Sequence, residues 1–390
     1  MIAFWKEGDH AMAGEATKVA LRREFVLLAL EEGVNMRALC RQFGISPTTG
    51  YKWLERYVQQ GDSGLQDRSR EPHSSPNRTP ADMERRVLAV RDEHPAWAGR
   101  KIKRRLEDLA VKGVPPPSTI TGILRRHGRL DPKESHKHRP WQRFEAEAPN
   151  DLGQMDFKGH FALADGGRCH PLTVLDDHSR FCLGLRACGD EQRTTVQEQL
   201  TVIFRSYGLP QRLLMDNGSP WGTQGQARLC RLGVWLVRLG VTVSHTGIYH
   251  PQTIGKDERF HRTLVDEVIC REAFQDLPHA QRRFDPWREM YNRERPHDSL
   301  GLAVPASRYR DSQQTFPATL PPIEYSRQDI VRRVDQTGRI SYRNHIFRVG
   351  KALEGFPVAL RPSETDGVLN VYFCHQRLHQ IDLKSQDPED

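Results

Sequence analysis

The sequence has no long apolar stretch and no apolar signal segment. Its longest apolar runs, such as residues 25–30, are far shorter than the roughly 20 residues that a membrane-spanning helix needs. The first 13 residues carry Lys6, Glu7 and Asp9 where a secretory signal would have an apolar centre. We therefore expect a cytoplasmic protein that does not contact a membrane.

Cysteine pairs at metal-binding spacing and phosphate-binding glycine loops are also missing. The seven cysteines are scattered and never stand as CxxC, so we expect reduced thiols rather than zinc ligands or disulfides. Neither GxxxxGK[ST] nor GxGxxG occurs, so no nucleotide cofactor is expected. If the protein is an enzyme, its catalytic groups are therefore expected to be side chains other than cysteines.

Positive charge is distributed unevenly along the 390 residues. Residues 1–140 hold 26 Lys and Arg against 18 Asp and Glu, whereas residues 141–390 hold 32 of each. The formal net charge of +8 thus arises in the first third of the chain. Such a segment suits a part that neutralises DNA phosphates, although charge alone is equally compatible with a solvated surface.

A helix-turn-helix domain is predicted for residues 17–60. Its helices are expected over Val19–Glu32, Met36–Phe43 and Pro47–Gln59. Asn35 and Ser46 are typical capping residues, and Gly44 makes the short turn between the last two helices. The third helix would enter the major groove of DNA, although a plain three-helix bundle is the alternative. The residues that would face DNA are Thr48, Thr49 and Lys52, with Arg56 as a further candidate.

Residues 81–130 are predicted to form a second helical unit, which is the most basic part of the chain. Its helices are expected over Asp82–Glu93, Gly99–Leu109 and Ser118–His127. We interpret it as a second helix-turn-helix-like DNA-binding domain, with a purely structural role as the alternative. The candidate DNA ligands are Arg100, Lys101, Arg104, Arg125 and Arg126.

From residue 150 onward, strand-like runs alternate with helical ones, which predicts an α/β core with a mixed sheet covered by helices. The expected strands are Gly153–Phe157, Pro171–Leu175, Phe181–Arg186, Arg212–Met215 and Val241–Ser244. Helices are expected over Thr194–Tyr207 and between Gly255 and Asn292. After a Pro-rich stretch, four short strand-like runs divided by turn signals predict a small C-terminal β-barrel.

These signals give a multidomain organisation. A flexible N-terminus (1–16) precedes the helix-turn-helix domain (17–60), a linker (61–80), the second helical domain (81–130) and a connector (131–149). The catalytic core (150–310), a second linker (311–326) and the β-barrel domain (327–384) follow.

Three carboxylates stand out by their positions. Asp156 and Asp216 each end an apolar strand, where open sheets place their ligand sites, and Glu258 opens a helix after a glycine turn. Gathered together, three carboxylates repel one another and need cations, and their hard oxygen atoms select Mg²⁺ or Mn²⁺. A single Asp at a strand end is more often a turn residue, but the contexts of all three together favour a metal site.

The motifs around these carboxylates resemble those of the DDE transposases. Met155-Asp156-Phe157, the segment from Met215 to Ser219, and residues 250–264 are similar to the motifs of bacterial insertion-sequence enzymes that share the retroviral integrase core. Residues 291–297 and 299–301 match the usual continuation of that group, and the resemblance spans roughly residues 21–309. Forty-one residues separate Asp216 from Glu258, which is more than the group's usual gap.

This resemblance implies a ribonuclease-H-like fold and a catalytic, metal-binding set of Asp156, Asp216 and Glu258. It also implies two Mg²⁺ or Mn²⁺ ions per active site, DNA cleavage followed by joining of 3′ ends to target DNA, and a homo-oligomer on DNA. The DNA partners would be the terminal inverted repeats of the element and its target. The alternative is a transposase-derived DNA-binding protein without catalysis; a ribonuclease-H-type nuclease would not need two helix-turn-helix units.

Helical periodicity also bears on the residues next to Glu258. It places Asp257 among apolar residues and Glu258 at the border of the apolar face, so the choice of Glu258 as ligand depends mainly on the motif. Arg262 lies one turn beyond Glu258 and is a candidate contact for DNA phosphate, as is Lys256, although an ordinary surface role is the alternative.

Overall fold

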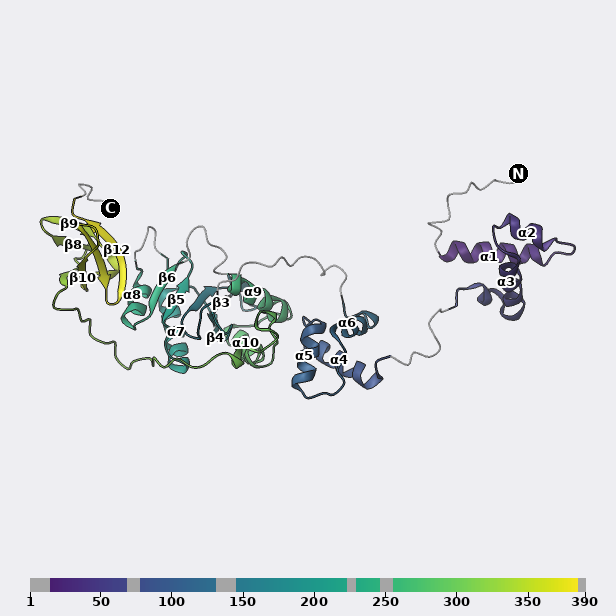
Figure 1. Cartoon of the computed structure of the whole chain (residues 1–390), viewed down its shortest axis with the longest axis horizontal. Coiled ribbons are helices and arrows are strands. Elements are labelled where there is room, and N and C mark those ends of the chain that lie inside the picture. Colours follow the sequence, from purple (N-terminus) through teal and green to yellow (C-terminus); the bar gives the residue numbers. More distant parts are fainter. Residues whose placement is uncertain (1–14, 69–77, 131–144, 223–228, 246–254, 385–390) are drawn as a thin grey trace. The chain divides into compact units, whose positions relative to one another are not determined.

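The computed structural model describes residues 15–68, 78–130, 145–222, 229–245 and 255–384 (Figure 1). Most of the predicted N-terminus and connector, part of the first linker, and motif residues 250–254 lie outside these ranges. No helix in the described ranges is long and apolar enough to cross a membrane. The chain divides into two compact units, residues 1–78 and 79–390, which are described separately.

The first unit contains the predicted helix-turn-helix. Its elements are α1 (Glu15–Ala29), α2 (Met36–Gln42), α3 (Pro47–Gln60) and a 3-10 turn, η1 (Gly61–Leu65). Asn35 and Ser46 cap α2 and α3 by accepting hydrogen bonds from backbone N–H groups of the first helical turn. Gly50 lets α3 approach its neighbours, because an added Cβ would lie 2.6 Å from the sulfur of Cys40 and 2.8 Å from the ring of Phe25.

Two boundaries of this unit differ from those predicted. The first helix ends at Ala29, before Gly33, which adopts a left-handed backbone conformation with φ of 81°. The first residues of the predicted linker pack back on the helices, because Leu65 is fully buried and its carbonyl accepts a hydrogen bond of 2.8 Å from Arg22. Leu65 stands among Gly, Ser and Asp residues typical of a linker, so the sequence did not indicate that it is buried.

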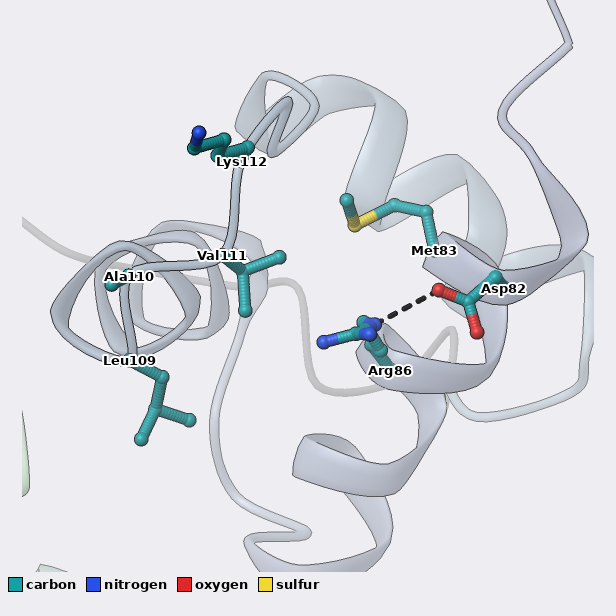
Figure 2. Close-up of a pocket in the computed structure, with 7 residues that line it drawn as sticks. All are labelled: Asp82, Met83, Arg86, Leu109, Ala110, Val111 and Lys112. Atoms are coloured by element: carbon teal, nitrogen blue, oxygen red, sulfur yellow. Dashed lines mark hydrogen bonds and ion pairs between the residues drawn. The ribbon is translucent and has the colours of Figure 1, made fainter.

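The second helical unit consists of α4 (Ala81–Glu93), α5 (Gly99–Asp108) and α6 (Pro117–Arg126). Its core includes the fully buried Trp97, Ile102 and Ile123. Figure 2 shows a hollow between the first turn of α4 and the loop after α5, where Asp82 pairs with Arg86 at 3.0 Å. The hollow carries none of the three predicted catalytic carboxylates.

A six-stranded mixed sheet forms the middle of the chain, where a mixed sheet of five strands was predicted. Its strands are β1 (Gly153–Phe157), β2 (Phe161–Ala162), β3 (Arg168–Asp176), β4 (Cys182–Cys188), β5 (Arg212–Met215) and β6 (Thr242–His245). The order is β2-β3-β1-β5-β6, with β4 also paired to β3. Strand β1 runs antiparallel to β3 and parallel to β5, and β5 runs parallel to β6.

Helices supply two apolar layers against this sheet (Figure 1). Helices α7 (Arg193–Tyr207) and α8 (Arg231–Arg238) pack in one buried cluster with residues of β1, β3 and β5. Helix α9 (Gly255–Leu264), the π-helical turn η4 (Val265–Ile269) and α10 (Leu277–Arg293) pack in a second cluster with residues of β3 and β4. Two 3-10 turns, η5 (Asp298–Leu300) and η6 (Pro305–Ser307), follow.

The C-terminal region contains two antiparallel sheets. Its elements are β7 (Ile330–Arg333), β8 (Arg339–Tyr342), β9 (His345–Arg348), the turn η7 (Lys351–Leu353), β10 (Pro357–Pro362), β11 (Val368–Phe373) and β12 (Gln376–Asp382). One sheet has the order β12-β11-β10-β7, and β8 pairs with β9. The predicted β-strand character is confirmed, whereas closure into a barrel stays a prediction. Strands β7 and β12 had not been predicted.

The C-terminal sheet binds the exposed edge of the central sheet. The side-chain amide of Gln376 accepts a hydrogen bond of 2.8 Å from the backbone N–H of Val243 on β6 and donates one of 2.9 Å to its carbonyl. Thr242 is also 3.2 Å from the ring of His375. The Gln376 amide thereby pairs with both the backbone N–H and the carbonyl of Val243, the groups that a further strand would otherwise pair with at this edge.

Asn292, from the motif after α9, has a structural role. Its amide accepts a hydrogen bond from the backbone N–H of Cys182 and donates one to the carbonyl of the same residue, at 2.8 and 3.0 Å. Asn292 is fully buried, so these bonds attach α10 to β4 in the protein interior.

We expect Asn292→Ala to lower the free energy of unfolding by about 2–4 kcal/mol, because two buried backbone groups would lose their partners. Arg293→Ala is the matched control, since this exposed neighbour pairs with Glu289 at the surface and its loss should change stability by less than about 1 kcal/mol. Differential scanning calorimetry of both variants tests this. Equal melting temperatures for the two variants would contradict the structural role.

Candidate active site

Two of the predicted carboxylates lie at adjacent strand ends. In the parallel β1–β5 pair, Gly153 is opposite Leu213 and Gln154 opposite Leu214. Continuing this register by two residues along each strand brings Asp156 beside Asp216, with both side chains on the same face. Burial, and then the negative charge of Asp216, raise the pKa of Asp156 to about 6. The strand pairing therefore assembles two carboxylates that repel each other.

Asp216 is held by hydrogen bonds to its side chain and backbone. The N–H groups of Gly218 (2.9 Å) and the Trp221 indole both donate to its Oδ1 atom. Nδ1 of His245, the last residue of β6, donates to its carbonyl oxygen at 2.9 Å. The three contacts come from the following turn and from the next strand of the sheet.

A neutral histidine from α9 lies beside Asp156. The Thr173 hydroxyl donates a hydrogen bond of 2.9 Å to the carbonyl of Asp156, so it must accept from Nε2–H of His261, also at 2.9 Å. Burial lowers the pKa of His261 to about 4, with a smaller contribution from Lys158. The ring is therefore neutral at physiological pH, and its unprotonated Nδ1 is 3.9 Å from the Asp156 carboxylate.

Glu258 is exposed on the first turn of α9. It precedes His261 by three residues, so both lie on the same side of the helix. The structure thus brings Asp156 and Asp216 together and places Glu258 one helical turn from His261, the neighbour of Asp156. In the described residues, no group of three Asp, Glu, His or Cys side chains has a metal-binding arrangement.

Asp257, the neighbour of Glu258, is buried, as helical periodicity predicted. Its side chain is 2% exposed, and its Oδ1 atom has no hydrogen-bond partner in the described part of the chain. Burial, followed by the charges of Asp156 and Asp177, raises the pKa of Asp257 well above its usual value. The exposed Glu258, not the buried Asp257, is therefore the carboxylate that solvent can reach.

Asp176 and Asp177 stabilise the end of β3. Asp176 accepts hydrogen bonds from the backbone N–H groups of Asn150 and Ser179 and so stabilises the turn after β3. Asp177 accepts from Gln154 and forms an ion pair with Lys256. Lys256, predicted to bind DNA, is thus already engaged with a buried carboxylate. Sequence reasoning missed this pair, which links residues of two elements far apart in the chain.

The predicted DNA-facing residues of the first unit lie on the first turns of α3. Thr48 and Lys52 are exposed, whereas Thr49 is half-buried and its hydroxyl is 2.8 Å from that of Ser46. The Lys52 ammonium and the Arg56 guanidinium are 5.3 and 5.1 Å from the centre of the Trp53 ring. The α3 surface therefore carries two cations beside an aromatic ring.

The predicted DNA ligands of the second helical unit, on α5 and α6, differ in exposure and in their ion-pair partners. Arg126 pairs with Glu84 at 2.6 Å and Arg104 with Asp108 at 2.9 Å, while Arg125 is exposed on α6. Two residues of α5 face acidic or basic groups of the core region. Arg100 is 3.2 Å from Asp298, and Lys101 has a pKa lowered to about 8 by burial and then by Arg295. Arg262 is exposed on α9.

Family comparisons agree with this architecture. Residues 146–251 and 239–305 each match an integrase core domain, and residues 329–389 match the C-terminal domain of IS481 family transposases. Residues 21–73 match a helix-turn-helix domain, and residues 49–124 match a homeodomain-like domain.

Individual relatives are insertion-element proteins. An uncharacterized 31.7 kDa protein of insertion element IS407 from Burkholderia multivorans is 28% identical over 159 residues, or 41% of this chain and 55% of the relative. An uncharacterized IS136 protein from Agrobacterium fabrum is 33% identical over 119 residues, or 30% and 58%. The chain spans about half the length of the curated relatives that it matches.

Solved structures also match. The HTLV-2 integrase catalytic core domain in complex with magnesium aligns with 43% of this chain and 100% of its own, at 14% identity and a TM-score of 0.34.

The mixed sheet and the integrase core matches define a ribonuclease-H-like integrase core. Helix-turn-helix units precede it and an IS481-type domain follows it. In its domains the chain is similar to the transposases of bacterial insertion sequences.

The raised pKa of Asp156 predicts a pH-dependent cost to stability. The folded protein keeps this proton up to a pH of about 6, whereas the unfolded chain loses it near the ordinary value of 3.8. The folded state binds more protons between these values, so the free energy of unfolding falls as the pH rises through this window.

Asp156→Asn should therefore stabilise the protein at pH 7 by about 1–2 kcal/mol in EDTA, with allowance for partial exposure. The gain should disappear at pH 4, where the wild-type carboxyl is protonated. The exposed Asp266→Asn is the control and should give no gain at either pH. Thermal unfolding at both pH values checks this, and an equal gain at pH 4 would argue against a titrating Asp156.

Proposed function

We propose that this chain is an active DDE transposase that cleaves DNA at the terminal inverted repeats of its element and joins the 3′ ends to target DNA. The observation that carries the proposal is the parallel β1–β5 register, which brings Asp156 beside Asp216. Helix α9 supports it by placing His261 next to Asp156 and Glu258 one turn away. The three proposed catalytic residues are Asp156, Asp216 and Glu258.

The donor set fits hard divalent cations. All three side chains offer carboxylate oxygen atoms, the ligands that Mg²⁺ and Mn²⁺ prefer. Asp156 and Asp216 are adjacent, and burial followed by the charge of Asp216 raises the pKa of Asp156, so a cation would stabilise the ionised state of this site. When bound, two such ions would supply Lewis-acid stabilisation of the charge on the attacking and leaving oxygen atoms of the phosphodiester.

The chain's own residues would organise this chemistry. Asp156 lies on β1 and Asp216 directly follows β5 of the same sheet, whereas Glu258 comes from a separate helix. Thr173 holds the backbone carbonyl of Asp156, and His261 adds no positive charge because it is neutral. Arg262, exposed one turn beyond Glu258, would contact a phosphate beside the scissile bond.

DNA binding would begin at the helical units. Helix α3 would present Thr48, Thr49 and Lys52 to the major groove of the inverted repeats. In the second unit, the exposed Arg125 is free to meet phosphate directly. Four other predicted ligands would exchange their present surroundings for DNA, namely Arg100, Lys101, Arg104 and Arg126.

Joining two element ends requires at least two active sites, so we propose a homo-oligomer on DNA, with the C-terminal strands closing as a small barrel to help assemble it. Lys256 would act near DNA only after release from Asp177.

A transposase-derived DNA-binding protein without catalysis is not favoured, because the carboxylates of the integrase core motifs are retained.

We predict that Glu258→Gln abolishes Mg²⁺-dependent cleavage of an end-containing DNA fragment. The loss should exceed about 100-fold, because removing a ligand should cost at least as much as removing a group that orients one. Asp257→Asn is the matched control on the adjacent residue and should leave cleavage measurable, because Asp257 is buried away from solvent and burial raises its pKa. Cleavage that survives Glu258→Gln but not Asp257→Asn would refute the assignment.

We also predict that Lys52→Ala weakens binding to every DNA sequence and reduces the slope of log affinity against log salt by about 1. Thr48→Ala should instead reduce the preference for end DNA and leave the salt slope unchanged. Lys18→Ala, an exposed charge on α1, is the control. Binding measured by fluorescence anisotropy at several salt concentrations separates these effects; an unchanged slope in Lys52→Ala would exclude a phosphate contact.

A further inference from the structure

Trp221 connects the two strand ends that carry the aspartates. Its indole N–H donates to Oδ1 of Asp216, five residues earlier in the turn after β5. Its ring stacks on Phe157, the residue after Asp156 on β1, with ring centres 5.2 Å apart and planes at 7°. The side chain is 2% exposed, so the indole N–H has little access to water.

The contact is selective for one carboxylate oxygen. The backbone N–H of Gly218 donates to the same Oδ1 atom at 2.9 Å, so two donors converge there. A carboxylate with one oxygen held by two donors loses most of its freedom to rotate. An indole nitrogen donates only and has no lone pair for a metal, so Trp221 cannot itself be a ligand.

We infer that Trp221 is a positioning residue for Asp216. Its hydrogen bond fixes the rotation of the carboxylate, so that Oδ2 is presented to a divalent cation shared with Asp156. The inference rests on the proposed metal-dependent function and deepens it. Stacking on Phe157 sets the plane of the indole, and therefore the direction of the N–H, from the strand that carries the other aspartate.

Hydrogen bonds that orient metal ligands affect metal binding strongly, and their removal costs about 10–100-fold in affinity. Trp221→Phe is the informative change, because phenylalanine keeps an aromatic ring against Phe157 and lacks only the donor. Trp235→Phe is the matched control. Trp235 belongs to the same apolar cluster and stacks on Phe204 at 6.3 Å, away from both aspartates in the chain.

The test measures Mn²⁺ binding to the full chain without DNA, by electron paramagnetic resonance of free Mn²⁺. We expect Trp221→Phe to weaken Mn²⁺ binding about 10-fold or more and Trp235→Phe to leave it unchanged. Cleavage of end DNA should need correspondingly more Mg²⁺ for half-maximal rate in Trp221→Phe. Wild-type Mn²⁺ affinity in a folded Trp221→Phe would overturn the inference.

A second measurement on the unmodified protein keeps the inference testable if Trp221→Phe fails to fold. The chain has seven tryptophans, each with one indole N–H resonance in a ¹H–¹⁵N spectrum. On addition of Mg²⁺, one resonance should shift in the wild type and none in Asp216→Asn. The absence of any shift in a wild-type protein that cleaves DNA would overturn the role of Trp221 alone. A wild type that neither binds Mn²⁺ nor cleaves would instead reject the proposed function.

Discussion

Parallel pairing of β1 with β5 is the constraint on which the site depends. Backbone hydrogen bonds fix the register of the two strands, and a slip of one residue would turn one aspartate to the opposite face of the sheet. The apolar residues before each aspartate, Met155 and Met215, are buried in the same cluster and hold that register. The position of the two carboxylates is therefore a property of the sheet core, with side-chain contacts adjusting only their orientation.

This arrangement is electrostatically unfavourable without a counter-charge. Asp156 and Asp216 are adjacent, Asp257 is buried nearby, and His261, which lies beside Asp156, is neutral. The packing of α9 and α10 on β3 and β4 must offset this repulsion. The fold therefore maintains this carboxylate cluster at the expense of its own stability.

Local sequence signals predicted much of this structure. The strands Gly153–Phe157 and Arg212–Met215 have the predicted bounds, because alternating and apolar runs end at polar turn residues. The burial of Asp257 followed from helical periodicity. Strands β7 and β12 were missed, because charged and polar residues interrupt the apolar alternation of both.

Contacts between distant residues were not predictable from local signals. Nothing in the spacing of Lys256 and Asp177 indicates that they pair, or that the Trp221 indole reaches Asp216. The same limit applies to the second helical unit, where charge predicted a DNA surface but not that Arg100 meets Asp298. Residue type and period report the local environment, whereas partners are set by how the elements pack.

The amide of Gln376 gives the C-terminal sheet a consequence for how the protein can be divided. Gln376 is the first residue of β12 and lies 133 residues after Val243 in the chain. Its side chain nevertheless forms hydrogen bonds with the outward backbone N–H and carbonyl groups of Val243 on β6. A fragment ending near residue 310 would leave that strand edge open to self-association, the usual origin of aggregation in exposed sheets. A catalytic fragment that does not self-associate must therefore include β12, because the C-terminal sheet covers the unpaired edge of β6.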